Sequence, residues 1–148
     1  MHRRALLALA LGTIALACGG PPPPTIPGIE LRGNRIVLSD RILFEHDSDR
    51  ILEESYPILD RVVSLLDQHD EIIRVQVQGH SSTDGQLARN QELSAQRAAA
   101  VAAYLREHGV RQEVTSQGYG PTYPLCHEDT EECHQQNRRV EFFVDLRQ

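Results

Sequence analysis

Apolar and polar residues alternate along two segments of the chain, and each alternation predicts a strand with one buried face. The segments are residues 73–79 and 140–147. Their inward positions are expected to be Ile73, Val75 and Val77 in the first segment, and Val140, Phe142, Val144 and Leu146 in the second. The first of these strands is expected to end at Gly79.

Two other segments have the spacing of helices. Apolar residues recur in steps of three or four and predict an amphipathic helix; they are Leu52, Tyr56, Leu59, Val63 and Leu66. Pro57 fits only in the first turn of that helix, which places Ser55 near the N-cap. Residues 86–108 are rich in alanine and predict a second helix, closed by Gly109.

Shorter elements lie around these. The turn-forming pair Gly33 and Asn34 separates residues 29–31 from residues 35–38, which predicts a hairpin. Residues 114–118 are expected to form a short strand.

The first 28 residues have the pattern of an exported, lipid-anchored protein. Residues 1–17 start with two arginines and continue with an apolar run too short to span a bilayer, which is typical of a signal peptide. The run ends in Ala-Leu-Ala before Cys18, a pattern that favours lipidation of this cysteine; the alternative is cleavage elsewhere and loss of Cys18. Residues 18–28 contain four consecutive prolines and predict an extended tether. Residues 29–148 then form the domain.

The charge of the chain limits its partners. The formal net charge is −6, and without Arg3 and Arg4 it becomes −8, from 13 basic and 21 acidic residues. An acidic body argues against binding to nucleic acid. All fifteen basic residues are arginines, so no lysine side chain is present for amide attachment to the cell wall.

Two motifs identify a family resemblance. Residues 79–98 read GHSSTDGQLARNQELSAQRA, and residues 137–142 read NRRVEF. Together they resemble the OmpA-like C-terminal domain family, which includes peptidoglycan-associated lipoproteins. The resemblance implies a periplasmic domain that binds peptidoglycan, and it makes residues 42–44 the first core strand. With that strand, a βαβαββ order follows the hairpin, and we expect an α+β fold with two helices on one face of a mixed sheet.

The resemblance also implies a binding site for diaminopimelate, the wall amino acid with a free ammonium and a free carboxylate. Arg97 matches the arginine that takes the carboxylate, and Asn90 and Arg138 match polar positions of the same groove. Ser82 stands where the family has its aspartate, so a neutral hydroxyl replaces a charge. Asp84, two residues later, has two interpretations: a displaced ligand-binding anion or, as we favour, the N-cap of the following helix.

The two cysteines of the loop before the last strand suggest a cross-link. Cys126 and Cys133 in an exported protein predict a disulfide. The neighbouring histidines leave a metal site as the less favoured alternative. His80 is expected to be a structural hydrogen-bonding residue.

The chain shows no catalytic signature, and we expect a protein that is not an enzyme and that binds no cofactor or metal. The sequence predicts an outer-membrane lipoprotein, acylated with palmitate or a similar chain, whose domain faces the periplasm and binds the peptidoglycan peptide stem without a covalent bond. Other envelope proteins are possible further partners. The alternative is an interaction module of an envelope or secretion assembly that has lost wall binding, and the residue that favours it is Ser82.

Overall fold

The computed structural model describes residues 25–148 of the chain. The expected signal peptide, the lipidation site Cys18 and most of the tether fall in residues 1–24, outside the described part. Within residues 25–148, no helix is both long and apolar enough to cross a membrane.

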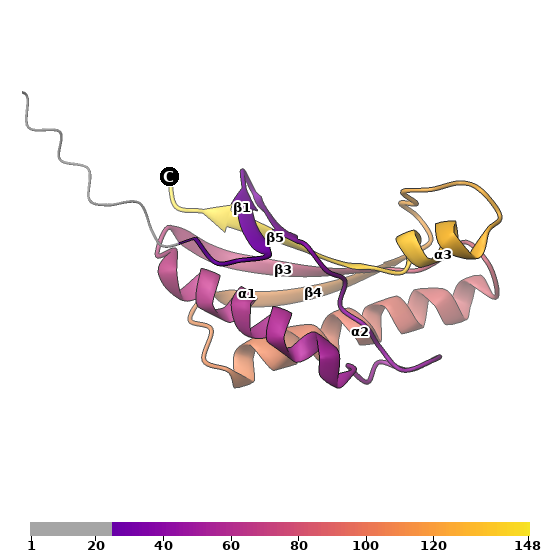
Figure 1. Cartoon of the computed structure of the whole chain (residues 1–148), viewed down its shortest axis with the longest axis horizontal. Coiled ribbons are helices and arrows are strands. Elements are labelled where there is room, and N and C mark those ends of the chain that lie inside the picture. Colours follow the sequence, from indigo (N-terminus) through magenta and orange to yellow (C-terminus); the bar gives the residue numbers. More distant parts are fainter. Residues whose placement is uncertain (1–24) are drawn as a thin grey trace, which may run out of the picture.

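Five strands form one mixed sheet in the order β1-β2-β5-β3-β4 (Figure 1). They are β1 (Ile29–Arg32), β2 (Arg35–Leu38), β3 (Ile72–His80), β4 (Glu113–Gly120) and β5 (Val140–Leu146). β3 and β4 are parallel, and the other neighbours are antiparallel. The predicted hairpin is present, with Gly33 at a positive φ of 59° in its turn.

Two long helices cover one face of the sheet, and a third, short helix lies at one of its ends (Figure 1). They are α1 (Tyr56–Gln68), α2 (Leu87–Glu107) and α3 (Glu131–Asn137). The core lies between the two long helices and the sheet, and its fully or almost fully buried members include Leu59, Leu105, Val75, Val77 and Phe142. The predicted α+β fold, with two helices on one face of a mixed sheet, is confirmed.

α2 packs against the sheet with its backbone almost in contact, because glycines lie beneath it. Gly79 of β3 and Gly118 of β4 are direct neighbours in the sheet. A Cβ atom at Gly79 would lie 2.0 Å from the Ser94 carbonyl oxygen, and one at Gly118 would lie 2.4 Å from the Ala95 nitrogen. The Ser94 hydroxyl also accepts a 2.9 Å hydrogen bond from the Gly120 amide. These contacts fix the half of α2 that carries the site residues.

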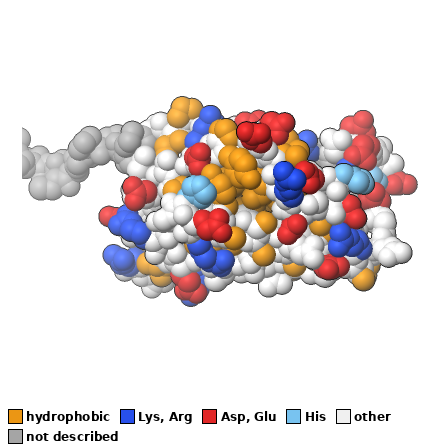
Figure 2. All heavy atoms as spheres, turned by 90° about the horizontal axis from the view of Figure 1, so that it is seen from below, with side chains coloured by type: hydrophobic (Ala, Val, Ile, Leu, Met, Phe, Trp, Pro, Cys, Tyr) orange, Lys and Arg blue, Asp and Glu red, His pale blue; other side chains and the backbone are white. Residues whose placement is uncertain are grey.

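The outer side of the helix layer carries a strip of apolar side chains between acidic and basic ones (Figure 2). α1 and α2 contact each other through Tyr56 and Tyr104, whose rings stack with centroids 5.3 Å apart. The Tyr104 hydroxyl donates a 2.6 Å hydrogen bond to Asp60 Oδ1. Burial and this hydrogen bond raise the pKa of Tyr104 to about 12. The phenol therefore stays protonated and keeps this link between the helices.

The ends of the long helices agree with the sequence, with one difference in detail. Pro57 lies in the first turn of α1 and Ser55 is its N-cap residue. The Ser55 hydroxyl does not cap the helix, however; it accepts a 2.7 Å hydrogen bond from the Leu43 amide. Gly109 follows α2 with a positive φ of 81°, as a glycine past a helix end commonly does.

Three inward-facing sets differ from the prediction. In β5, Phe142 and Val144 are buried as expected, but Leu146 at the end of the strand is 41% exposed. In β3 the structure buries Ile72 and leaves Ile73 45% exposed, because the register with β5 shifts between Ile72 and Arg74. In α1, Leu59 and Leu66 are fully buried as predicted, but Leu52 precedes the helix. The rest of the buried face of α1 consists of Ile58, Val62 and Leu65.

The prediction of a strand at residues 42–44 is wrong. Phe44 forms only an isolated bridge to Ile51, and the chain between them makes a turn. We call residues 41–51 the strap. The strap does not join the sheet, because β2 of the hairpin already pairs with the side of β5 that faces away from β3. Asp47 in the strap has a positive φ of 49°.

Candidate functional site

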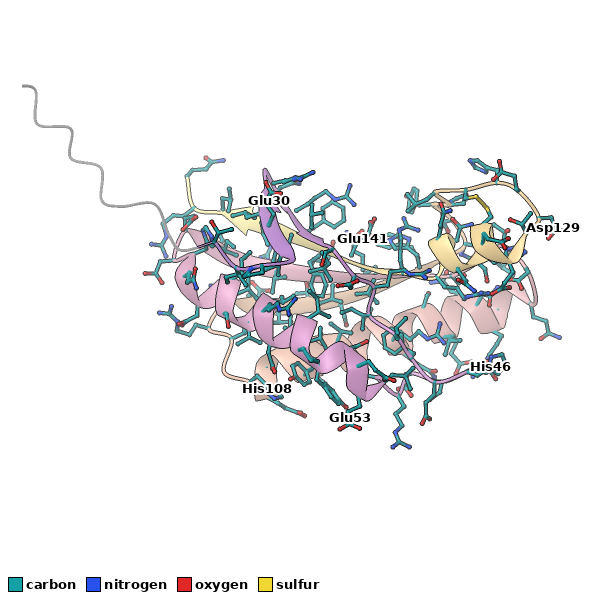
Figure 3. The ribbon with its side chains drawn as sticks, viewed as in Figure 1. Glu30, His46, Glu53, His108, Asp129 and Glu141 are labelled. Carbon is teal, nitrogen blue, oxygen red and sulfur yellow. A yellow bond between two sulfur atoms is a disulfide. The ribbon has the colours of Figure 1, made fainter. Side chains whose placement is uncertain are left out.

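A groove of about 870 Å³ lies at the end of the domain where α3 is found. One wall is the strap, the other is α3, and the floor comes from the loop after β3 and the first half of α2. His46 of the strap and Asp129 before α3 both lie at this end, far from Glu30 of β1 (Figure 3). All five residues expected at the binding site line the groove, namely Ser82, Asp84, Asn90, Arg97 and Arg138.

Arg97 lies half-buried in the groove and holds the strap. Its Nε donates a 2.8 Å hydrogen bond to the Ser48 carbonyl, and Nη2 donates one of 3.4 Å to the Glu45 carbonyl. The guanidinium lies 5.0 Å from the centre of the Phe44 ring. Within residues 25–148, no carboxylate is close enough to pair with it. Burial, followed by repulsion from Arg138, lowers its pKa. Arg97 is thus a cation with spare N–H groups and no directly paired carboxylate in the described part of the chain, which suits a carboxylate ligand.

Asn90 uses both N–H groups of its amide to hold the loop after β3. Nδ2 donates to the Ser82 carbonyl at 3.2 Å and to the Asp84 carbonyl at 2.6 Å. Only the amide oxygen is left to face a ligand. The N–H groups of Asn90 therefore position the loop after β3 and are not free to donate to a ligand.

The interpretation of Asp84 as a helix cap is wrong. The N-cap of α2 is Gln86, which has no side-chain cap hydrogen bond, and Asp84 lies two residues before it. The Asp84 carboxyl is 48% exposed and lines the groove. A hydrogen bond from Ser82 and the nearby charges of His134 and Arg138 lower its pKa, against the effect of partial burial. Asp84 is therefore a carboxylate at the groove surface.

Arg138 forms the opposite edge of the same site. Its Nη2 is ion-paired with Glu131 of α3, and Nη1 lies 3.5 Å from the Ser82 hydroxyl. Ser82 itself is only 4% exposed. The residue at the family's aspartate position therefore lies beneath its charged neighbours.

The sequence interpretation missed α3, which carries one wall of the groove. Thr130 is its N-cap and accepts a 3.3 Å hydrogen bond from the Cys133 amide, with Glu131 and Glu132 in the first turn. A threonine followed by two acids is a helix-start signal that could have revealed this element. The fully buried Asn137 closes the loop before α3, because its amide bonds to the backbone of Leu125 and Cys126.

A disulfide joins Cys126 to Cys133, as the sequence predicts, with their Cα atoms 5.3 Å apart. It ties the loop before α3 to the first turn of that helix and encloses only a few residues. On the chain-entropy account, a loop of this length is worth roughly 2.5 kcal/mol. Glu128 lies close to both sulfur atoms, but sulfurs joined in a disulfide are not available as thiolate metal ligands. The metal-site alternative is therefore not supported.

His80, directly before the loop of the groove, is buried on the other side of the sheet. The structure places its ring against Tyr119, with centroids 5.6 Å apart, and neither ring nitrogen has a well-directed hydrogen bond among the described residues. Nε2 lies 3.5 Å from Glu141 Oε2. The expected hydrogen-bonding role of His80 is therefore not seen among the described residues. Its ring packs against Tyr119 and lies beside the Glu141 carboxylate.

Glu141 is the charged centre of this cluster and gives a pH-dependent contribution to stability. Contacts with His80 and then Arg139 and Arg35 lower its pKa to about 2 from the usual 4.5, against the effect of burial. Because the folded-state pKa is depressed, the stabilisation is complete above about pH 4.5 and disappears as the pH falls toward 2.

We expect Glu141→Gln to lower the free energy of unfolding by about 2–3 kcal/mol at pH 7, since Glu141 is only 17% exposed. Near pH 2 the substitution should cost much less. Urea denaturation of both proteins at pH 7 and pH 2.5 measures the difference, and an equal cost at the two pH values would contradict this account.

Comparison with known proteins gives a consistent set of relatives. The family model described as the OmpA family matches residues 43–138. The chain is 32% identical to the outer-membrane lipoprotein YfiB of Pseudomonas aeruginosa, covering 97% of this chain and 95% of YfiB. It is 34% identical to the peptidoglycan-associated lipoprotein of Legionella pneumophila, covering 70% of this chain and 58% of that protein.

A solved structure shares the fold as well. The cell wall anchor of the type VI secretion system of Pseudomonas aeruginosa superposes with a TM-score of 0.65 at 28% identity, covering 80% of this chain and 86% of the other. Some relatives are much longer: the chain covers only 14% of the photosystem I P700 chlorophyll a apoprotein A2 of Gloeobacter violaceus, at 33% identity.

Proposed function

The chain belongs to the OmpA family, and from this premise we propose that it is a non-enzymatic envelope lipoprotein that binds peptidoglycan non-covalently through the groove between the strap and α3. The proposed contact residues are Asp84, Asn90, Arg97 and Arg138, with Ser82 beneath them. The names of its relatives, a peptidoglycan-associated lipoprotein and a cell wall anchor, support this proposal.

The observation that carries the proposal is the charge arrangement of the groove. Arg97 has no carboxylate partner within residues 25–148, and Asp84 has a partly exposed carboxylate. A ligand with one free carboxylate and one free ammonium could pair with both. Diaminopimelate in the peptide stem of the wall has this chemistry, whereas a neutral sugar could satisfy neither charge.

The proposed lipid anchor agrees with the shape of the domain. The described chain starts at one end of the sheet, while the groove lies at the other end with α3 (Figure 1). A lipid on Cys18, followed by the proline-rich tether, would leave the groove facing away from the outer membrane and toward the wall. We expect the mature protein to begin at acylated Cys18, as measured by mass spectrometry; an unmodified N-terminus at another residue would contradict the anchor.

A pulldown on purified sacculi tests the function. The full chain, purified in detergent, should sediment with sacculi and be released by free diaminopimelate. A lack of sedimentation would argue against wall binding and favour the alternative, a protein-interaction module of an envelope assembly.

A further inference from the structure

Two charged groups of the groove are open to a ligand. Arg97 forms no ion pair with a carboxylate in the described chain, although the charges of Asp47 and Asp49 act on it from the strap. Toward α3, Arg138 is already paired with Glu131, and Asp84 presents a carboxylate that is about half-exposed. A ligand that carries an ammonium and a carboxylate would therefore be oriented, with its ammonium toward α3.

Ser82 is a poor candidate for the ammonium contact. It is 4% exposed, and its side chain is engaged on two sides, by the Asp84 carboxylate and by Nη1 of Arg138 at 3.5 Å. A buried hydroxyl with these two neighbours can hold the charged side chains in place, but it has little exposed surface that a ligand could contact. Asp84, in contrast, is about half-exposed at the groove.

His134 of α3 supports Asp84 from the other side. Its side chain is 9% exposed, and Nδ1 makes no hydrogen bond in the described part of the chain. That nitrogen lies 3.9 Å from Asp84 Oδ1, while Nε2 lies 3.1 Å from Asp129 Oδ1. His134 follows Cys133 directly, so the disulfide fixes the turn of α3 from which the ring projects. The imidazole thus limits the positions open to the Asp84 carboxylate.

We propose that Asp84 is the residue that accepts the ligand's ammonium group, and that Ser82 and His134 position its carboxylate for this contact. The ligand class is an amino acid or peptide end with a free primary ammonium and a carboxylate. This inference rests on the proposed function, and it assigns the negative charge of the site to a residue two positions away from the family's aspartate.

The test compares two ligands by calorimetry on the full chain in detergent. One is free diaminopimelate, and the other is the same compound with its amines acetylated. Asp84→Asn should weaken binding of the free amino acid roughly 10- to 30-fold, because a charge-assisted hydrogen bond is lost. It should leave the already weaker binding of the acetylated compound nearly unchanged. Asp145→Asn, which removes an exposed carboxylate from the other face of the sheet, is the control for net charge.

Two further variants separate contact from support. The double variant Ser82→Asp with Asp84→Ser moves the charge to the buried position 82 and should not restore the lost affinity; recovery would contradict the assignment of the contact to Asp84. His134→Ala should weaken only the free amino acid, by roughly 3- to 10-fold, whereas His134→Gln, which keeps a polar group at the site, should recover part of the loss. Equal effects on both ligands would make His134 merely structural.

Failure of the Asp84 assignment can be distinguished from failure of the proposed function. Wild-type protein that binds neither sacculi nor diaminopimelate would overturn both. Wild-type protein that binds, with Asp84→Asn binding equally well, would overturn the assignment of Asp84 alone.

Discussion

Arg97→Ala should abolish detectable sedimentation with sacculi. The substitution removes the cation of the groove that has no carboxylate partner within residues 25–148, so a ligand carboxylate would be left without its counter-charge. A loss of about 2–3 kcal/mol is expected, or roughly 30- to 150-fold in affinity. Sedimentation with sacculi and calorimetry with free diaminopimelate measure the change.

Arg97 also holds the strap, so this effect needs a matched control. Arg89 likewise donates to the strap, to the Asp47 carbonyl at 3.1 Å, but its charge is already paired with Asp47 and Glu92. Arg89→Ala should therefore loosen the strap while changing affinity by only a few-fold. If the two substitutions weakened binding equally, strap ordering would explain the role of Arg97 and carboxylate binding would not.

Gly79→Ala should be the most damaging single-methyl substitution that we predict for the fold. The new Cβ would lie 2.0 Å from the Ser94 carbonyl oxygen and 3.3 Å from the Ala98 methyl, and the first of these atoms belongs to the backbone of α2. Relief requires α2 to move away from the sheet. We expect a loss of about 3 kcal/mol or more in the free energy of unfolding, above the usual range for overpacking.

Gly33→Ala is the matched control, because a Cβ there meets nothing within 4 Å and only the positive φ of 59° opposes it. Its cost should be about 1–2 kcal/mol. Urea denaturation measures both. A cost at Gly79 no greater than at Gly33 would show that α2 can shift freely, and the site on its first half would then be less rigid than described.

Much of the fold could be predicted because its signals are local. Turn residues define the β1–β2 hairpin, Pro57 and Gly109 mark helix ends, and alternation marks β3 and β5. The matched motifs also selected a set of site residues that the structure brings to one groove. Each of these inferences depends on neighbours within a few positions, or on a pattern that such neighbours repeat.

The remaining features depend on residues that are distant in sequence. Ile72 replaces Ile73 at the core because pairing with β5 shifts the register. Residues 42–44 belong to the strap, where Phe44 contacts Arg97 of α2, since β2 of the hairpin takes the edge of the sheet beside β5.

The sequence by itself determined most of the elements, the family and the residue types of the candidate site, since propensity and periodicity act along the chain. The tertiary structure alone decided how these residues lie and which charges surround them. Asp84 lies at the groove beside His134, 50 positions later, and the cap role that its sequence context favours belongs to Gln86. The charge neighbours of a carboxylate, and hence its chemistry, come from packing, which brings distant residues within a few ångströms of one another.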